Sequence, residues 1–296
     1  MQKAVLPARE RAWLSFGDEV VCGYVVRAED AVWADTPEKI HRLHGLGFPG
    51  SPLSPTFPFL DVVRIPVTPF LQLENATGGT SPHEAQLTGG RFIDHPPFSG
   101  NGFVTGVPER IVPLWWLHPT RIPAGAEVWR VYADAHEELV AVFPDVASGW
   151  QTVGEYAFEP EGRRAPSPVL NVFGDWNSHR VFADRLADGR TAIASFEELP
   201  GMTRSRRGLW GARVESDEVT AVSAVRFTCS WNGMPFQIID RFDGNGGVTA
   251  QLVYLGGDVL QAEASRLTKT DAGVYEASVP WNELTEVQGV EVVPTA

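Results

Sequence analysis

The sequence predicts a mainly β or α+β protein, and three features of the chain support this fold class. Glycine and proline supply 29 and 23 of the 296 residues, so the chain turns often and long helices are not expected. Ten tryptophans and 16 phenylalanines favour strands and bury large areas. The last quarter of the chain alternates apolar and polar residues in short runs, which is typical of strands with one buried face.

The C-terminal part is predicted to be a small antiparallel sheet with one helix. Alternating runs at 225–231, 236–240 and 249–254 are separated by Asn232-Gly233 and by the glycine-rich segment 243–247. Because Asn-Gly favours the positive φ angles of a tight hairpin, we expect the first two runs to pair. The unit is completed by a predicted helix over 258–267 and strands over 273–279 and 287–293.

The N-terminal part is predicted to be an irregular β-rich domain. Strands are expected within residues 11–35, followed by a short helix that begins at Thr36 and ends at Gly45 or Gly47. The Thr36 side chain can accept from free amides, and Pro37 stands where its missing N–H costs nothing.

A long loop rich in glycine and proline is predicted over residues 74–108, after a strand at 60–65. Three phenylalanines within the loop indicate that it is tied down to the rest of the protein. Further strands are expected at 112–117 and 127–132, and residues 135–143 fit either a strand or a helical turn.

The chain is predicted to have three parts: residues 1–160, 161–214 and 215–296. The boundaries are the proline-containing linker 159–168 and an arginine-rich segment. Between them, residues 178–188 are expected to form a short amphipathic helix, with Asp175 or Ser178 as its cap. The segment with Arg204, Arg206, Arg207 and Arg213 is interpreted as an exposed linker or as a partner of the acidic C-terminal part.

The net charge is −13, from 37 acidic and 24 basic side chains. A protein that follows phosphates needs clustered basic residues, so no nucleic-acid or anionic-membrane binding is expected. Residues 215–296 carry 12 acidic and four basic side chains, a balance of −8, so this part is predicted to be an acidic module suited to a basic protein partner. Only three of the 24 basic residues are lysines, which we interpret as the codon usage of a GC-rich bacterial genome.

A cytoplasmic location is predicted from the cysteines and the N-terminal segment. Cys22 and Cys229 are far apart in the chain and are expected to be free buried thiols rather than a disulfide framework. The first ten residues lack the apolar stretch of a signal peptide, and no run approaches the roughly 18 apolar residues of a membrane span. No cofactor is expected.

Several histidines and acidic residues are candidates for a catalytic or metal-binding role. His41 and His44 share one side of the predicted helix, but no third ligand with motif spacing accompanies them, so no metal site is predicted. In the long loop, His95 could be a general base that an adjacent acid orients. His179 is a weaker candidate of the same kind. The catalytic set under this hypothesis is Glu74, Asp94, His95 and Arg130.

The sequence leaves open whether the protein is an enzyme. The leading hypothesis is a non-enzymatic protein-binding module that masks or scaffolds a basic partner, as an immunity protein neutralises a toxin. Its predicted contact residues lie in the long loop and the acidic module: Phe92, Phe98, Phe103, Asp240, Asp243 and Asp258. The alternative is a hydrolase or transferase acting on a nucleotide or sugar, whose pocket should bring Glu74, Asp94 or His95 to Arg130. A third hypothesis is a small-ligand sensor that uses Trp115, Trp116 and Trp129.

Overall fold

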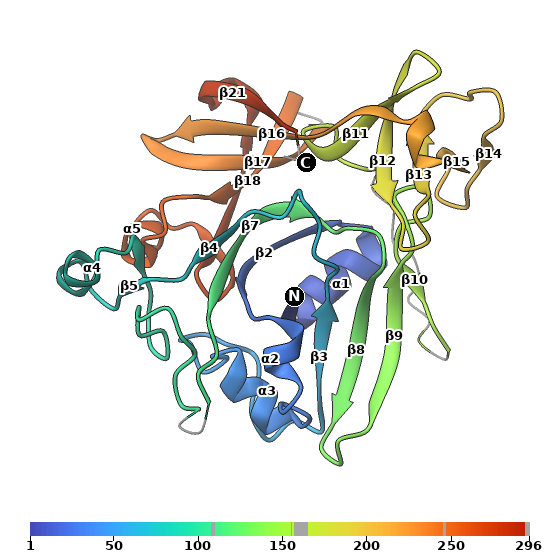
Figure 1. The fold of residues 1–296 in the computed structure, drawn as a ribbon. Coiled ribbons are helices and arrows are strands. Elements are labelled where there is room, and N and C mark those ends of the chain that lie inside the picture. The colour runs from blue at the N-terminus through green and yellow to red at the C-terminus, as the bar shows by residue number, and fades with distance from the viewer. Residues whose placement is uncertain (108–109, 155, 157–164, 245–246, 294–296) are drawn as a thin grey trace.

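A computed structural model describes residues 1–107, 110–154, 156, 165–244 and 247–293 of the chain. The protein is mostly β, with 46% strand, 14% helix and several antiparallel sheets, which confirms the predicted fold class. Figure 1 shows the large sheet as the upper layer and the N-terminal strands and helices below it. Among the described residues, no helix has the length and apolar character needed to cross a membrane.

The large sheet contains eleven antiparallel strands from the second half of the chain. Its strand order is β14-β15-β13-β12-β11-β16-β17-β18-β20-β19, and β21 also pairs with β16. The strands are β11 (Leu170–Trp176), β12 (His179–Arg185), β13 (Thr191–Ser195), β14 (Thr203–Arg204), β15 (Trp210–Val214), β16 (Thr220–Trp231), β17 (Met234–Gly244), β18 (Gly247–Tyr254), β19 (Thr268–Asp271), β20 (Val274–Pro280) and β21 (Thr285–Val292). One α-helix, α5 (Val259–Ala264), and two short 3₁₀ helices (Ser216–Glu218 and Trp281–Glu283) connect them.

The long strand β16 determines the shape of this sheet. Residues 224–226 pair with both β11 and β21, and residues 227 and 228 pair with both β17 and β21. Because a strand has two edges, β11 and β17 must follow one another along the same edge of β16, with β21 on the other. The sheet therefore spreads into two wings, β11–β15 and β17–β20, as Figure 1 shows.

The first half of the chain forms two smaller sheets and a pair of short parallel strands. The N-terminal sheet has the order β1 (Gln2–Val5), β3 (Phe59–Arg64), β8 (Ala126–Tyr132), β9 (Glu137–Phe143), β10 (Gln151–Thr152). The middle sheet has the order β2 (Val20–Val25), β7 (Trp115–Arg121), β4 (Leu73–Asn75), and the parallel pair is β5 (Gly78–Gly79) and β6 (Phe92–Ile93). The helices are α1 (Pro7–Phe16), α2 (Ala28–Ala31), α3 (Pro37–Leu43) and α4 (Pro82–Thr88).

Predictions that rested on local signals are confirmed. Thr36 caps α3, since its hydroxyl accepts from the Lys39 amide at 3.5 Å. Asn232 and Gly233 have φ angles of 51° and 72° and join β16 to β17, as a tight hairpin requires. The strand at 60–65, the strand alternative for 135–143, and the C-terminal helix and closing strands are also present, with ends shifted by a few residues.

Two predictions of secondary structure are wrong. The predicted helix over 178–188 is absent, and residues 179–185 form strand β12, because Asn177 and Ser178 adopt positive φ angles and turn the chain back onto β11. Residues 7–16 are helix α1, although strands were expected from residue 11 onward. Two residues in the sequence are typical of helix ends. Pro7 stands at the first position of α1, and Gly17 ends α1 with a φ of 71°.

The two halves of the chain share one hydrophobic core. The largest cluster joins Val62 of the N-terminal sheet and Tyr24 of the middle sheet to Leu170, Ile239 and Val253 of the large sheet. The predicted three-part division stays a prediction, although the large sheet continues across residue 214. Most of the predicted linker lies outside the described residues, which omit 157–164.

Buried ion pairs also join the halves. Arg121 of β7 donates to Asp184 of β12, with 3.1 Å between Nη1 and Oδ2, and the Val146 amide donates to the same carboxylate. Within the arginine-rich segment, Arg204 and Arg206 are exposed, as expected of a linker. Arg207 and Arg213, however, pair with Glu19 and Asp145, which are acids of the N-terminal half and not of the acidic module.

Candidate functional site

A large cavity lies between α1 and the β17–β20 wing and has a volume of about 620 Å³. This volume falls within the range of about 300–1,000 Å³ that is common for small-molecule sites. Its lining combines residues from the first 20 positions and from beyond position 238 with residues between them, such as Phe48, Arg121 and Leu170. The cavity therefore brings residues from both ends of the chain to one place.

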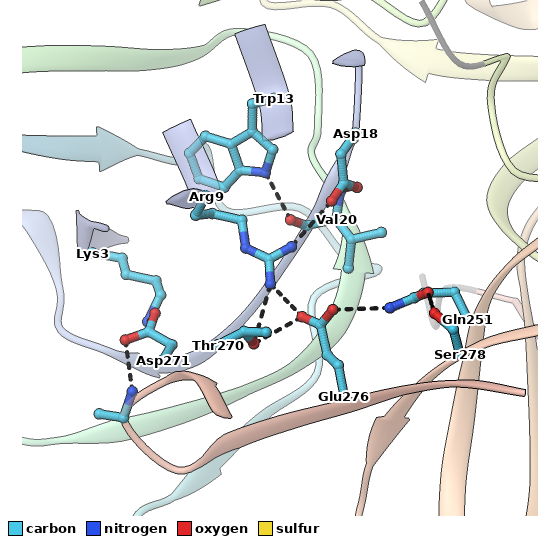
Figure 2. A network of polar contacts seen from close by, with 11 residues as sticks. Lys3, Arg9, Trp13, Asp18, Val20, Gln251, Thr270, Asp271, Glu276 and Ser278 are labelled. Carbon is cyan, nitrogen blue, oxygen red and sulfur yellow. Dashed lines mark hydrogen bonds and ion pairs between the residues drawn. The ribbon is translucent and has the colours of Figure 1, made fainter. Parts of the chain in front are cut away.

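One wall of the cavity is polar and is centred on Arg9 of α1 (Figure 2). Its Nη1 donates to Asp18 Oδ2 at 3.0 Å, and its Nη2 donates to Thr270 Oγ1 at 3.3 Å and to Glu276 Oε1. Burial alone would lower the pKa of Arg9, but the nearby charges of Glu276 and Asp18 raise it overall. Arg9 is therefore a permanent cation fixed between two carboxylates.

The second oxygen of Glu276 is also satisfied. Gln251 Nε2 donates to Glu276 Oε2 at 3.1 Å, and Ser278 donates to the amide oxygen of Gln251 (Figure 2). Glu276 and Ser278 project from the same face of β20, because side chains alternate along a strand, and Gln251 is the register partner of Ser278. The strand pattern thus places this polar row on one side of the sheet.

A second ion pair lies beside the first. Lys3 of β1 contacts Asp271 of β19 at 2.8 Å, and each side chain is 9% exposed. The Lys3 ammonium also donates to the Tyr24 carbonyl. We refer to the pairs Lys3–Asp271 and Arg9–Glu276 together as the terminal clamp, because they join the first ten residues to the last thirty. Between them on β2, burial raises the pKa of the Cys22 thiol to about 12, so this thiol is protonated and unreactive at neutral pH.

The remaining lining is mostly apolar. Leu6, Ala12 and Phe16 contribute from the side of α1, and Leu170 and Ile239 from the large sheet. Asp240, which the sequence analysis named as a binding residue, also lines this cavity. The site therefore combines an apolar surface with a wall of fixed charges and hydrogen-bonding groups.

The four predicted catalytic residues do not meet in one pocket. Glu74 lies on β4, where Arg91 holds it in a fork at 2.9 and 2.8 Å and His118 contacts it at 3.2 Å. The hydrogen bonds of Arg91 are the main reason why the pKa of Glu74 is lowered. Glu74 is therefore an ionised partner of two basic groups.

Asp94 and His95 lie together, but Asp94 does not orient the imidazole. Asp94 is buried and accepts from the backbone amide of His95 at 2.7 Å, and burial raises its pKa. The acid at the ring is Glu263 of α5, which lies 3.0 Å from His95 Nε2. Glu263 also accepts a hydrogen bond from the Tyr275 hydroxyl at 2.6 Å. No sequence signal links His95 to an acid 168 positions away.

Arg130 belongs to a third cluster. It donates to both oxygens of Asp61 at 2.8 and 2.9 Å and lies 3.6 Å from Glu10 of α1. The rings of Phe59 and Tyr156 cover its guanidinium, with centroids at 3.9 and 5.0 Å. Among the described residues, no contact joins Arg130 to Glu74, Asp94 or His95. The catalytic roles of these residues stay predictions.

The predicted binding residues differ in accessibility. Phe92 and Phe98 are buried in the shared core, whereas Phe103 is 43% exposed. Asp243 is exposed, and Asp258 caps α5 by accepting from the Leu260 amide at 2.9 Å. Of the three phenylalanines, only Phe103 can touch a partner in this conformation.

Comparison with known proteins gives no further guide to the function. No protein-family model, no curated protein and no solved structure matches this chain. The function must therefore be argued from the arrangement of residues alone.

Replacing Arg9 with methionine should destabilise the protein strongly. The change leaves Glu276 and Asp18 without their main cation, and breaking a buried ion pair costs about 3–5 kcal/mol. We expect this loss in the free energy of unfolding measured by urea denaturation. The double variant Arg9→Met with Glu276→Gln should recover part of it, because the neutral amide no longer needs a cation. Additive losses in the double variant would show that the pair is not coupled.

Glu10 should make stability depend on pH. Burial, followed by the charge of Asp61, raises the pKa of Glu10 from 4.5 to about 7. The folded state then holds a proton that the unfolded state has lost, so this contribution to stability falls as pH rises between those two values, by about 3 kcal/mol in total. Glu10→Gln removes the titration, and its stability relative to wild type should increase from about pH 5 to about pH 8.

The matched control for Glu10 is the exposed Glu198. The difference in unfolding free energy between Glu198→Gln and wild type should stay constant across the same pH range, because an exposed carboxyl has no burial to relieve. If Glu10→Gln shows the same flat difference, Glu10 does not hold a proton in the folded state.

Proposed function

We propose that this protein binds a small molecule in the cavity between α1 and the β17–β20 wing. The observation that supports this function is the cavity itself, with a volume of about 620 Å³, a charged wall around Arg9 and an apolar surface opposite. A concave, mostly apolar pocket with a few fixed polar groups is the usual form of a ligand site.

The chemistry of the lining indicates a ligand with one polar and one apolar face. Each oxygen of Glu276 has a donor, and Arg9 is held by two carboxylates and Thr270. Such groups are fixed before a ligand arrives, so little entropy is lost in ordering them. Hydroxyl and amide groups of a ligand would contact this wall, and a ring or alkyl portion would lie against Phe16 and Ile239.

The position of the cavity gives the ligand an effect on stability. Its walls come from both ends of the chain, so a bound molecule would add contacts across the terminal clamp. Any ligand that binds only the folded state stabilises it in proportion to the logarithm of its concentration.

Filling the cavity should abolish ligand binding without disturbing the clamp. Ala12 lines the cavity and is half-buried, so Ala12→Phe places a ring in it. We expect that members of a panel of nucleosides, sugars and amino acids raise the melting temperature of the wild type and leave Ala12→Phe unchanged. The control is Ala264→Phe at the exposed end of α5, which should respond like the wild type. A panel without effect on the wild type, or with equal effect on Ala12→Phe, would contradict the proposal.

We propose protein binding as a second candidate function, because β21 provides a specific surface for it. Seven of its eight residues are exposed, and among the described residues it pairs only with β16. An open strand edge is a template for an extended segment of another protein. The acidic module to which β21 belongs favours a basic partner, in agreement with the masking role that the sequence suggests.

Capture from a cell extract of the source organism would test this second candidate. We expect one basic protein in equal amount at low salt, with loss at high salt because its attraction is electrostatic. Glu286→Lys on β21 should abolish capture, and Glu197→Lys, an exposed residue before β14, should not. Capture that neither salt nor Glu286→Lys affects would rule out β21 as the contact.

A further inference from the structure

Arg226 of β16 is a buried cation without an acidic partner. The residue is 6% exposed, and its Nη2 donates to the Phe70 carbonyl. Its Nη1 is buried and has no hydrogen-bond acceptor among the described residues. Arg226 also forms no ion pair with any of these residues. Burial lowers the pKa of Arg226, and no neighbouring carboxylate counteracts this effect. A buried charge normally has a counter-ion, so this arginine needs an explanation.

Arg226 acts electrostatically on His118, together with Arg91 and Glu74. The positive charges of Arg91 and Arg226 add to burial in lowering the pKa of His118, and Glu74 opposes them. Glu74 is neutralised by its fork with Arg91. Arg226 therefore leaves one positive charge at this place, and protonation of His118 adds a second, although the chain as a whole has a net charge of −13.

Arg226 and His118 contact the same loop, and His118 reaches the surface. The loop before β4 contacts both, because the Phe70 carbonyl accepts from Arg226 and the Gln72 carbonyl accepts from the His118 amide at 3.0 Å. The His118 side chain is 24% exposed, and Gln72 is exposed. His118 thus lies at a partly exposed position of β7, beside the loop that also contacts Arg226.

We propose that Arg226 and His118 bind an oxyanion, the carboxylate or phosphate group of a ligand. The Nη1 group of Arg226, which has no acceptor among the residues that the structure describes, can donate to such a group, and protonated His118 adds a donor at the ring nitrogen that does not face Glu74. An anion would supply the counter-charge that Arg226 lacks in the protein. This site is separate from the cavity, since Arg226, His118, Arg91 and Glu74 are all absent from its lining.

Anion binding at this site should become stronger as the pH falls. An anion favours the protonated form of His118, so affinity should rise as pH falls and His118 takes up a proton. The charged groups that face His118 are Glu74 on β4, Arg91 before β6 and Arg226 on β16. His118→Asn removes this titration and leaves the guanidinium in place.

Calorimetric titration with inorganic phosphate and with acetate tests the proposal. We expect phosphate to bind the wild type, and Arg226→Met to bind it about tenfold more weakly or not at all, because a charge-assisted bond is lost. The control Arg190→Met removes an arginine elsewhere whose side chain is 42% exposed, and it should bind like the wild type. Binding of acetate as well as phosphate would identify a general oxyanion site, and binding of phosphate alone a phosphoryl site.

Two results would overturn the proposal. One is equal phosphate affinity of the wild type and Arg226→Met, and the other is no binding of either anion to the wild type. If Arg226→Met does not fold, His118→Asn decides, because it should lose the part of the pH dependence that exceeds the titration of phosphate itself. An unchanged pH dependence in His118→Asn would then contradict the assignment.

Discussion

The ion pairs that Lys3 and Arg9 make with Asp271 and Glu276 are the interaction on which the rest of the structure depends. Charges are costly to bury unless they are paired, so each of these four side chains fixes its partner. Once they are paired, α1 lies against the β17–β20 wing, and Trp13 on the next turn donates to the Val20 carbonyl at 3.0 Å. The cavity and the core shared by the two halves both follow from this arrangement.

The elements that could be predicted are those determined by neighbouring residues. The Asn232-Gly233 turn and the Thr36 cap depend on side chains within three positions of each other, so the sequence alone was sufficient. The sequence of β12 predicts a helix because Val181 and Phe182 fit the helical period as well as that of a strand, and pairing with β11 and β13 decides between the two. Helix α1 was missed although Pro7 and Gly17 mark its ends.

The site was less predictable than the fold, because its residues meet only in three dimensions. Arg9 and Glu276 look like ordinary surface charges in the sequence, and so does Arg226, which alternates with apolar neighbours in β16. In the structure the polar face of β16 at Arg226 is covered by the loop before β4, so a position that reads as solvated is buried. His95 likewise meets Glu263 rather than the adjacent acid, and only tertiary contacts could reveal this.

The great sequence separation of the clamp also has a consequence during synthesis of the protein. Arg9 and Glu276 are 267 positions apart, and ribosomes add about 5–20 residues per second, so α1 emerges about 13–50 s before its partner carboxylate exists. During that interval the apolar side of α1 and the strand before it have no β19 or β20 to contact. Lys3 lacks Asp271, and Arg9 lacks Glu276. The N-terminal half must therefore wait in an incomplete form, exposed to chaperones and to other nascent chains, until the last wing of the sheet leaves the ribosome.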